Sequence, residues 1–309
     1  FSVKENNWLG QGKQVAFDVQ LNDESIIGSI NLTDPNYDFL GNSVYYGFSN
    51  EKNDKPNQGF ENSIVSGSVG TSFEQYRDVN LNLGLSASYD DLQTDSTASD
   101  SLKKQSGTFE EIATSYGFTY DQRDRAFMPT SGSILSFGQS FPIHADKKFI
   151  YNRLNTSFYK SFSENIVGAT KFFVSSVNGL GEDDVRISKR QLLSQKRIRG
   201  FERNKIGPVD GNDHVGGNYS AALNFETNLP KALPESYNAD VGFFLDFGSV
   251  WGVDYDSSID DSNIIRSTTG VKLDWMSPIG PMNFVFSQNL NKADTDVTES
   301  FTFNLGTTF

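Results

Sequence analysis

Apolar and polar residues alternate with a period of two along most of this 309-residue chain. In the clearest run, Val79, Leu81 and Leu83 are interleaved with Asn80 and Asn82. This alternation predicts β-strands with one apolar and one polar face. Clusters of Asp, Asn, Ser, Gly and Lys separate the runs, and no helical period of 3.6 residues persists. The chain is therefore expected to be all-β.

The runs predict about sixteen strands, an even number as bacterial outer-membrane barrels require. Short turns such as 34–36 alternate with long acidic loops such as 90–107, 178–184, 204–217 and 252–263, which is typical of a barrel crossing a membrane. The predicted strands lie near residues 14–21, 25–33, 43–50, 60–72, 78–89, 108–121, 132–141, 149–161, 165–177, 185–193, 195–203, 218–228, 238–251, 264–275, 281–290 and 298–309.

Composition agrees with such a barrel but does not require it. The mean hydropathy is −0.46, and no run approaches the roughly 20 apolar residues of a spanning helix. The mean hydropathy does not reveal a barrel strand, because the inward residues of such a strand are polar. The chain has 26 Phe, 12 Tyr and 27 Gly, which suit strands, aromatic girdles and turns. A soluble β-sandwich also alternates, but the final Phe309 on an alternating strand favours the barrel.

Several kinds of chemistry are disfavoured. There is no cysteine and there are two histidines, so neither a disulfide framework nor a metal site of thiolates or imidazoles is expected. A net charge of −13 argues against binding nucleic acid. No phosphate-binding glycine loop or nucleophile triad is present. We therefore expect no cofactor and no enzymatic activity.

An ordered series of motifs then identifies a family. Residues 197–208 read RIRGFERNKIGP, and the series continues with LNFETNLP at 223–230, FFLDFGSVW at 243–251 and LDWMSPIGPM at 273–282. With NNWLGQG at 6–12, DRAFMPTSGS at 124–133, GGN at 216–218 and FTFNLGTTF at 301–309, it spans nearly the whole chain. The chain resembles outer-membrane insertases and translocators whose sixth extracellular loop carries Val/Ile-Arg-Gly-Phe/Tyr, here Ile198, Arg199, Gly200 and Phe201.

This resemblance implies a transmembrane antiparallel barrel, residues 14–309, with a long extracellular loop at about 197–217 folded into the lumen. Residues 1–13 would be a linker from periplasmic POTRA domains. Because residue 1 is Phe and no signal peptide precedes it, we expect a processed or shortened chain. The loop after Pro208 is short for the barrel assembly factors of the family, which leaves its shape open.

Strand parity points to the partners of the loop arginine. If Phe225 and Leu245 face lipid, Glu226 and Asp246 face the lumen on adjacent strands, where two carboxylates need a cation. In the family the loop arginine binds acidic residues at these positions, so Arg199 is the expected cation. Its rigid fork of donors can serve two carboxylates, unlike lysine. A purely structural role, in which the loop only braces the barrel, is equally open.

The resemblance also implies a lateral seam between the first and last strands, which opens so that a client strand can pair with an exposed edge. The predicted seam residues are Val15, Phe17, Val19, Phe301, Phe303, Leu305, Gly306 and Phe309. The expected function is folding and insertion of barrel proteins into the bacterial outer membrane.

The expected partners are unfolded barrel proteins, assembly lipoproteins reached mostly through the POTRA domains, and outer-membrane lipid with lipopolysaccharide. A secretion translocator of the same superfamily remains the alternative, and it would conduct through its pore and have a dedicated secreted partner. A passive porin would not need the Arg199 constellation. A soluble adhesin would not need detergent for extraction.

Overall fold

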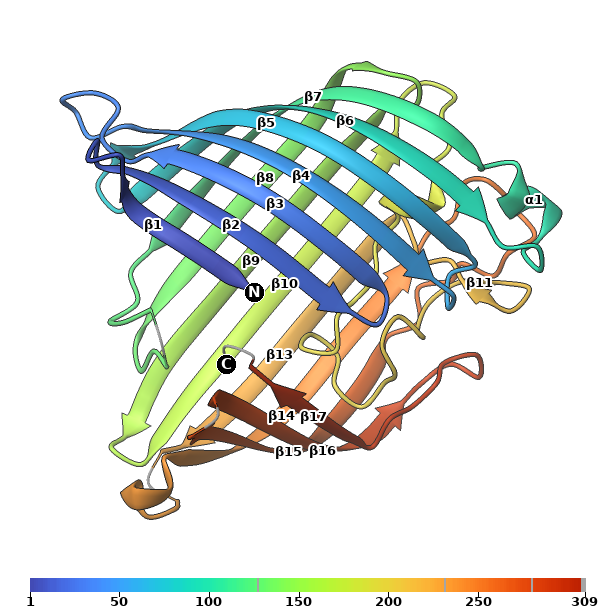
Figure 1. Ribbon diagram of the computed structural model, residues 1–309. Coiled ribbons are helices and arrows are strands. Elements are labelled where there is room, and N and C mark those ends of the chain that lie inside the picture. The colour runs from blue at the N-terminus through green and yellow to red at the C-terminus, as the bar shows by residue number, and fades with distance from the viewer. Residues whose placement is uncertain (127, 231, 279, 307–309) are drawn as a thin grey trace.

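The computed structural model describes residues 1–126, 128–230, 232–278 and 280–306. Most of them form one antiparallel sheet of fifteen strands that curls into a barrel (Figure 1). The strands of this sheet are β1 (Ser2–Trp8), β2 (Lys13–Asn22), β3 (Ser25–Asp34), β4 (Ser43–Lys55), β5 (Phe60–Tyr76), β6 (Val79–Thr94), β7 (Gly107–Asp121), β8 (Gly132–Ala145), β9 (Phe149–Ser163), β10 (Ile166–Gly179), β13 (Tyr219–Leu229), β14 (Ala239–Trp251), β15 (Arg266–Ser277), β16 (Gly280–Asn291) and β17 (Phe301–Leu305).

Each strand pairs with its neighbour in the chain, so the sheet is a meander with β1 and β17 at its edges. One end, which we call the loop end, carries the long connections 95–106, 180–218, 252–265 and 292–300. The opposite turn end carries short connections such as 9–12, 35–42 and 77–78. Because β1 and β17 are the first and last of fifteen successive antiparallel strands in the described sheet, they run in the same direction.

The two faces of the sheet have the polarity of a membrane barrel. Large apolar side chains such as Phe225, Phe243 and Phe286 are exposed on the outside. Polar side chains on the alternate residues, such as Asn224 and Thr268, are buried inside. This is the reverse of a soluble domain, and it is what alternating strands produce when lipid surrounds them. The predicted all-β antiparallel barrel is confirmed.

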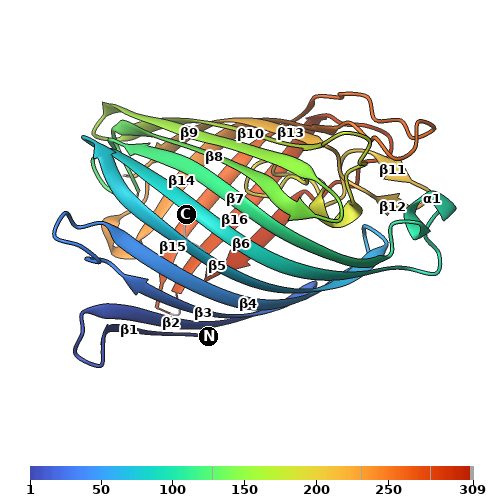
Figure 2. The same ribbon diagram turned by 90° about the horizontal axis from the view of Figure 1, so that it is seen from above.

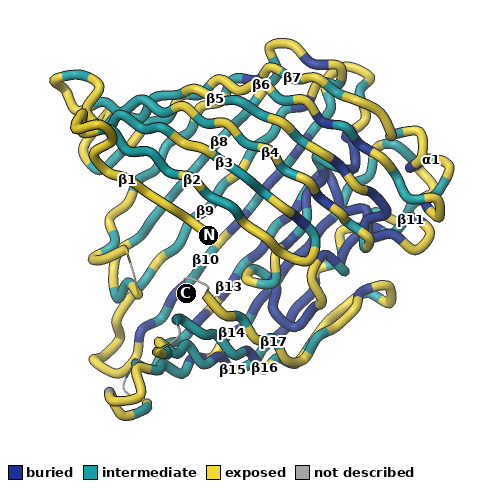
Figure 3. The backbone as a smooth tube through the Cα atoms, viewed as in Figure 1, coloured by how far each residue is buried: buried dark blue, intermediate teal, exposed yellow. Residues whose placement is uncertain are grey.

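The 180–218 connection enters the barrel interior. Its Ile198, Phe201 and Ile206 form a buried cluster with lumen-facing residues of the wall, among them Phe173 and Val250. Figure 2 shows this connection near β11 and β12, at the end of the barrel that carries α1, and Figure 3 shows buried residues gathered there. Folding of the long loop into the lumen is thus also confirmed.

Small elements stand at the loop end. A short helix, α1 (Asp100–Lys103), carries Leu102, which packs with Leu92, Ile187 and Val215 in a second cluster that caps the lumen. The long loop holds η1 (Ile187–Lys189) and the hairpin β11 (Val209–Asp210) with β12 (Asp213–His214), and η2 (Glu235–Tyr237) lies at the turn end. No helix among the described residues is long and apolar enough to cross a membrane.

Three sequence-based expectations need correction. Residues 185–193 and 195–203 are not strands but parts of the lumenal loop, where Leu193, Ile198 and Phe201 pack in one apolar cluster with wall residues. Residues 2–8, expected in a linker, form β1, so 14–21 is the second strand. The last strand is shorter than 298–309, and residues 307–309 lie outside the described part.

Candidate functional site: a charge network beneath the lumenal loop

The motif residues stand at the tip of the lumenal loop. Ile198 and Phe201 are almost fully buried and anchor the tip in the apolar cluster. Gly200 between them has φ +85°, and a Cβ there would lie 2.7 Å from Thr268 Oγ1 and 3.1 Å from Ser287 Oγ. Glycine at this position therefore permits both the positive φ and the close approach of the loop to the wall.

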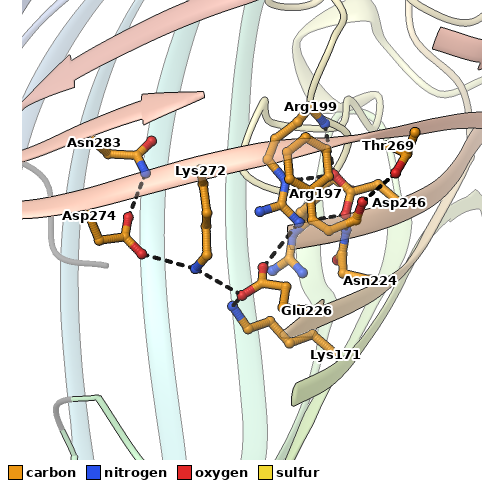
Figure 4. A network of polar contacts seen from close by, with 11 residues as sticks. Lys171, Arg197, Arg199, Asn224, Glu226, Asp246, Thr269, Lys272, Asp274 and Asn283 are labelled. Atoms are coloured by element: carbon orange, nitrogen blue, oxygen red, sulfur yellow. Dashed lines mark hydrogen bonds and ion pairs between the residues drawn. The ribbon is translucent and has the colours of Figure 1, made fainter. Parts of the chain in front are cut away.

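Arg199 reaches two carboxylates on neighbouring strands (Figure 4). Its Nε and Nη2 donate to the two oxygens of Asp246 at 2.7 and 2.6 Å, and its backbone N–H donates to Asp246 at 3.2 Å. Nη2 also lies 3.1 Å from Glu226 Oε1. The Phe244 ring lies against the guanidinium, with 3.8 Å from Cζ to its centroid. The structure thus brings together the three residues that parity and resemblance linked.

Glu226 is the centre of a wider network that the sequence reasoning missed. Lys171 Nζ and Lys272 Nζ lie 3.0 and 3.2 Å from its Oε2, so one carboxylate faces three cations. Lys272 is shared with Asp274 at 3.0 Å. Strand parity also predicts that both lysines face the lumen, because Lys171 precedes outward Phe172 and Lys272 follows outward Val271.

Asp246 has a second donor besides the arginine. Asn224 Nδ2 donates to it at 2.7 Å and also to the Arg197 carbonyl at 2.8 Å, which ties the loop backbone to β13. Asp246 is fully buried, so a charge there depends entirely on these donors. The arrangement is a satisfied ionic lock that holds the loop tip against β13 and β14.

Arg197 forms a second anchor on the opposite side of the loop tip. Its guanidinium stacks on Phe173, with 3.5 Å from Cζ to the ring centroid, and Nη2 donates to Asn155 at 2.6 Å. Burial, and then the nearby Arg153 charge, lower the pKa of Arg197 to about 10. Two arginines two residues apart therefore grip β9 and β10 on one side and β13 and β14 on the other.

The predicted seam residues fall into two groups. Phe301, Phe303 and Leu305 lie on the edge strand β17, and Gly306 follows it with φ +75°. Val15, Phe17 and Val19 lie on β2, one strand inside the edge, because β1 precedes it. Phe309 lies outside the described residues. Among the described residues β1 and β17 do not pair, so the sheet has two free edges.

Nothing in this site has the form of a metal or catalytic centre. Within the described residues, no group of three or more His, Asp and Glu side chains could hold a metal ion. The inward carboxylates are already saturated by lysine and arginine. The paired charges hold the tip of the lumenal loop in one place on the wall.

Comparison with known proteins fits this geometry. The model of the Omp85 superfamily domain matches residues 7–309. The chain belongs to the Omp85 superfamily. Among its relatives, the outer membrane protein assembly factor BamA of Neorickettsia risticii is 27% identical over 100% of this chain and 42% of its own length. BamA of Neisseria meningitidis is 23% identical over 99% of this chain and 44% of its own length. The chain thus spans less than half the length of these Omp85 relatives.

Solved structures share the fold of this chain. BamA from Haemophilus ducreyi lacking POTRA domains 1–3 superposes with a TM-score of 0.87 at 21% identity, covering 98% of this chain and 65% of that one. CdiB from Acinetobacter baumannii gives 0.60 at 11% identity, with 98% and 55% covered. The architecture of this Omp85 chain is therefore closer to the BamA barrel than to CdiB.

Proposed function

We propose that this chain is the membrane barrel of a bacterial outer-membrane assembly factor, which folds and inserts barrel proteins through its seam without a covalent reaction. The observation that carries the proposal is the lumenal loop that Arg199 docks on Asp246 and Glu226, inside a barrel that superposes on the BamA barrel with a TM-score of 0.87. In this proposal the edge of β17 receives a client strand, because unpaired backbone groups invite another strand. An insertase uses such an edge as a template.

The hydrogen-bond register identifies which residues offer free backbone groups. Phe1 and Val19 exchange two bonds of 2.8 Å, and the antiparallel ladder alternates, so Ser2 and Lys4 turn their N–H and C=O away from β2. On the other edge, Ser287 N–H donates to Ser300 C=O at 2.9 Å and Gly306 N–H donates to Pro281 C=O at 2.8 Å. The free groups of β17 are therefore those of Phe301, Phe303 and Leu305.

Strand length adds a second support. β2 and β3 near the seam have 10 residues each and β17 has 5, whereas β5, β6 and β7 have 17, 16 and 15. Tilted strands of about ten residues only just cover an apolar band roughly 25 Å tall. The bilayer is therefore expected to be thinner beside the seam than behind it, which lowers the cost of inserting a new strand there.

In this proposal the lumenal loop braces the wall on the β17 side. Arg199 and Arg197 join β9, β10, β13 and β14 through the loop tip. A rigid wall on that side would let the seam open by movement of β1 to β4 without collapse of the barrel. The network of Glu226 would thus be a positioning device for the edge and not a contact for the client.

The proposed partners follow from the fold and the relatives. Unfolded barrel proteins would be the clients, and outer-membrane lipid with lipopolysaccharide would surround the apolar exterior. Assembly lipoproteins would bind mostly through POTRA domains of the whole protein. The loop end would face the outside of the cell and the turn end the periplasm, as long loops and short turns do in such barrels.

A locking experiment tests the proposal in the full-length protein. Lys4→Cys and Phe303→Cys place one thiol on each of the two outer strands of the described sheet, β1 and β17, in a stretch of 309 residues that has no cysteine of its own. A bis-maleimide crosslink should stop assembly of client barrels in proteoliposomes, followed by the heat-dependent gel shift of folded clients. Val69→Cys with Leu85→Cys, which face each other on β5 and β6, is the matched lock within the wall. Client assembly at the normal rate with the seam locked would rule out the proposed mechanism.

A secretion translocator remains the second candidate because the CdiB structures share the architecture at a TM-score of about 0.6. Such a barrel passes an unfolded chain through its lumen and keeps its seam closed. A translocator would lose activity when a crosslink fixes the lumenal loop to the wall, and it would keep its activity when the seam is locked. The loop crosslink and the seam lock therefore separate the two candidates.

A further inference from the structure

Two neighbouring connections at the turn end carry large apolar side chains that are left in the open. In the connection between β3 and β4, Phe39 is 96% exposed, Leu40 71% and Tyr37 65%. In the connection between β1 and β2, Leu9 is 78% exposed, next to a half-exposed Trp8. Figure 1 shows both connections projecting at the end opposite α1, on the side of the sheet that ends in β1. Large apolar side chains exposed together at one end of a protein mark an interaction surface.

The connection from 35 to 42 is a rigid structure and not a loose loop. Asp38 Oδ1 accepts hydrogen bonds from the backbone N–H groups of Leu40 and Asn42 at 2.9 and 3.1 Å, and its Oδ2 accepts from Asn42 Nδ2 at 2.7 Å. Tyr37 N–H also donates to the Asn42 carbonyl at 2.9 Å. This bonding fixes the backbone from which Phe39 and Leu40 project. The exposure of those two side chains is therefore built into the turn.

The backbone of Leu9 also indicates that the exposure of its side chain is built into the turn. It has φ +53°, a conformation that favours Gly, Asn or Asp over a leucine. Glycines occupy the similar positions 10 and 12 of the same turn. A leucine held in an unfavourable conformation with its side chain in the open points to a role for that side chain.

The apolar band of the barrel exterior ends beside these turns. On the outward face, Phe17, Ile30 and Tyr46 are exposed on β2, β3 and β4. Lys13 and Asp34 lie further toward the turn end on the same face, and they form an ion pair of 3.9 Å. Lys13 is the register partner of Trp8 on β1. Charged and tryptophan side chains together at the end of an apolar band mark the headgroup layer. The two turns continue directly from that layer.

We propose that the turns 9–12 and 35–42 lie in the headgroup layer of the outer membrane's periplasmic leaflet, with Leu9, Phe39 and Leu40 reaching its acyl boundary. The occupant of this surface is lipid, because the patch is continuous with the lipid-facing wall and stands where ten-residue strands barely cross the bilayer. Apolar side chains on polar turns bind interfaces in this way. The proposal concerns the membrane alone and stands or falls independently of the assembly function.

Spin labels beside the apolar residues test the proposed location of the two turns, in the full-length protein in lipid vesicles. Gln11→Cys and Asn36→Cys place a nitroxide on each turn and leave Leu9, Phe39 and Leu40 in place. Relaxation by oxygen, which concentrates in lipid, is compared with relaxation by a water-soluble nickel chelate. Arg77→Cys is the matched control, because its turn joins the two longest strands and its side chain is almost fully exposed.

The expected result is a higher ratio of oxygen to nickel accessibility at both turns than at residue 77. Leu9→Ser should lower that ratio at residue 11, and Phe39→Ser with Leu40→Ser should lower it at residue 36. Ratios equal to the residue 77 control would place the turns in water and overturn the proposal. Protection from both reagents would also overturn it, because a protein surface would then cover the patch.

Discussion

Arg199→Lys isolates the fork geometry of the loop arginine from its charge. Lysine keeps one positive charge but cannot reach both oxygens of Asp246 and Glu226 together. We therefore expect the loss of about two of the contacts to these carboxylates, measured at 2.6 to 3.1 Å, while one is retained. At roughly 1.5–3 kcal/mol for each charge-assisted hydrogen bond, the docked loop loses about 3 kcal/mol at the lower end. This corresponds to about a hundredfold larger undocked fraction.

Trypsin cleavage of the folded protein in lipid vesicles measures that fraction. The docked tip contains Lys196, Arg197 and Arg199, and the variant keeps a cleavable residue at 199. When opening is fast relative to cleavage, the rate follows the open population, so cleavage should rise about a hundredfold. Arg203→Lys is the matched control, since this half-exposed arginine meets Glu24 only at 3.8 Å and such exposed pairs contribute about 0–1 kcal/mol. Equal cleavage of the two variants would refute the ionic lock.

Three further outcomes are expected. Gly200→Ala should undock the loop because a Cβ at φ +85° meets the wall, whereas Gly67→Ala, with open space and an ordinary backbone, should leave trypsin cleavage unchanged. Phe201→Ala should lower the thermal midpoint of unfolding on gels, since emptying such a buried site costs about 3–5 kcal/mol; an unchanged midpoint would mean that the cluster repacks. Burial, and then two neighbouring aspartate charges, raise the pKa of Asp213 above its ordinary value. Docking of the loop therefore favours the protonated carboxyl. Protection of the loop amides from hydrogen exchange, corrected for the intrinsic exchange rate at each pH, should be greatest at acidic pH and fall as pH rises above about 4. Asp213→Asn should flatten this profile.

The barrel was predictable from the sequence because lipid on one side and a wet lumen on the other impose a strict period of two on every wall strand. The same parity placed Glu226 and Asp246 inward, and the structure sets both beside Arg199. The lumenal loop was mispredicted as two strands. Its apolar residues Leu193, Ile198 and Phe201 are buried against the wall without forming a strand. A few apolar residues in a short segment cannot show which of these two structures buries them.

Two other features had no usable signal. β1 (Ser2–Trp8) carries Lys4 and Glu5 among few apolar residues, so its sequence is typical of a linker, and only pairing with β2 makes it a strand. Arg197 docks on Phe173 through a contact between distant segments that no local spacing encodes. Both depend on tertiary pairing, which a single sequence does not reveal.

Lys272 connects the charges around the loop tip to the last strands of the sheet. Its Nζ lies 3.2 Å from Glu226 and 3.0 Å from Asp274, and Asn283 on β16 donates to Asp274 at 2.6 Å. Asn304 on β17 in turn donates to Asn283 at 3.4 Å. A polar chain therefore runs from the docked loop across the lumenal face to β17. A displacement of β16 or β17 would change the surroundings of Glu226, so strand movement there and loop docking would be energetically coupled.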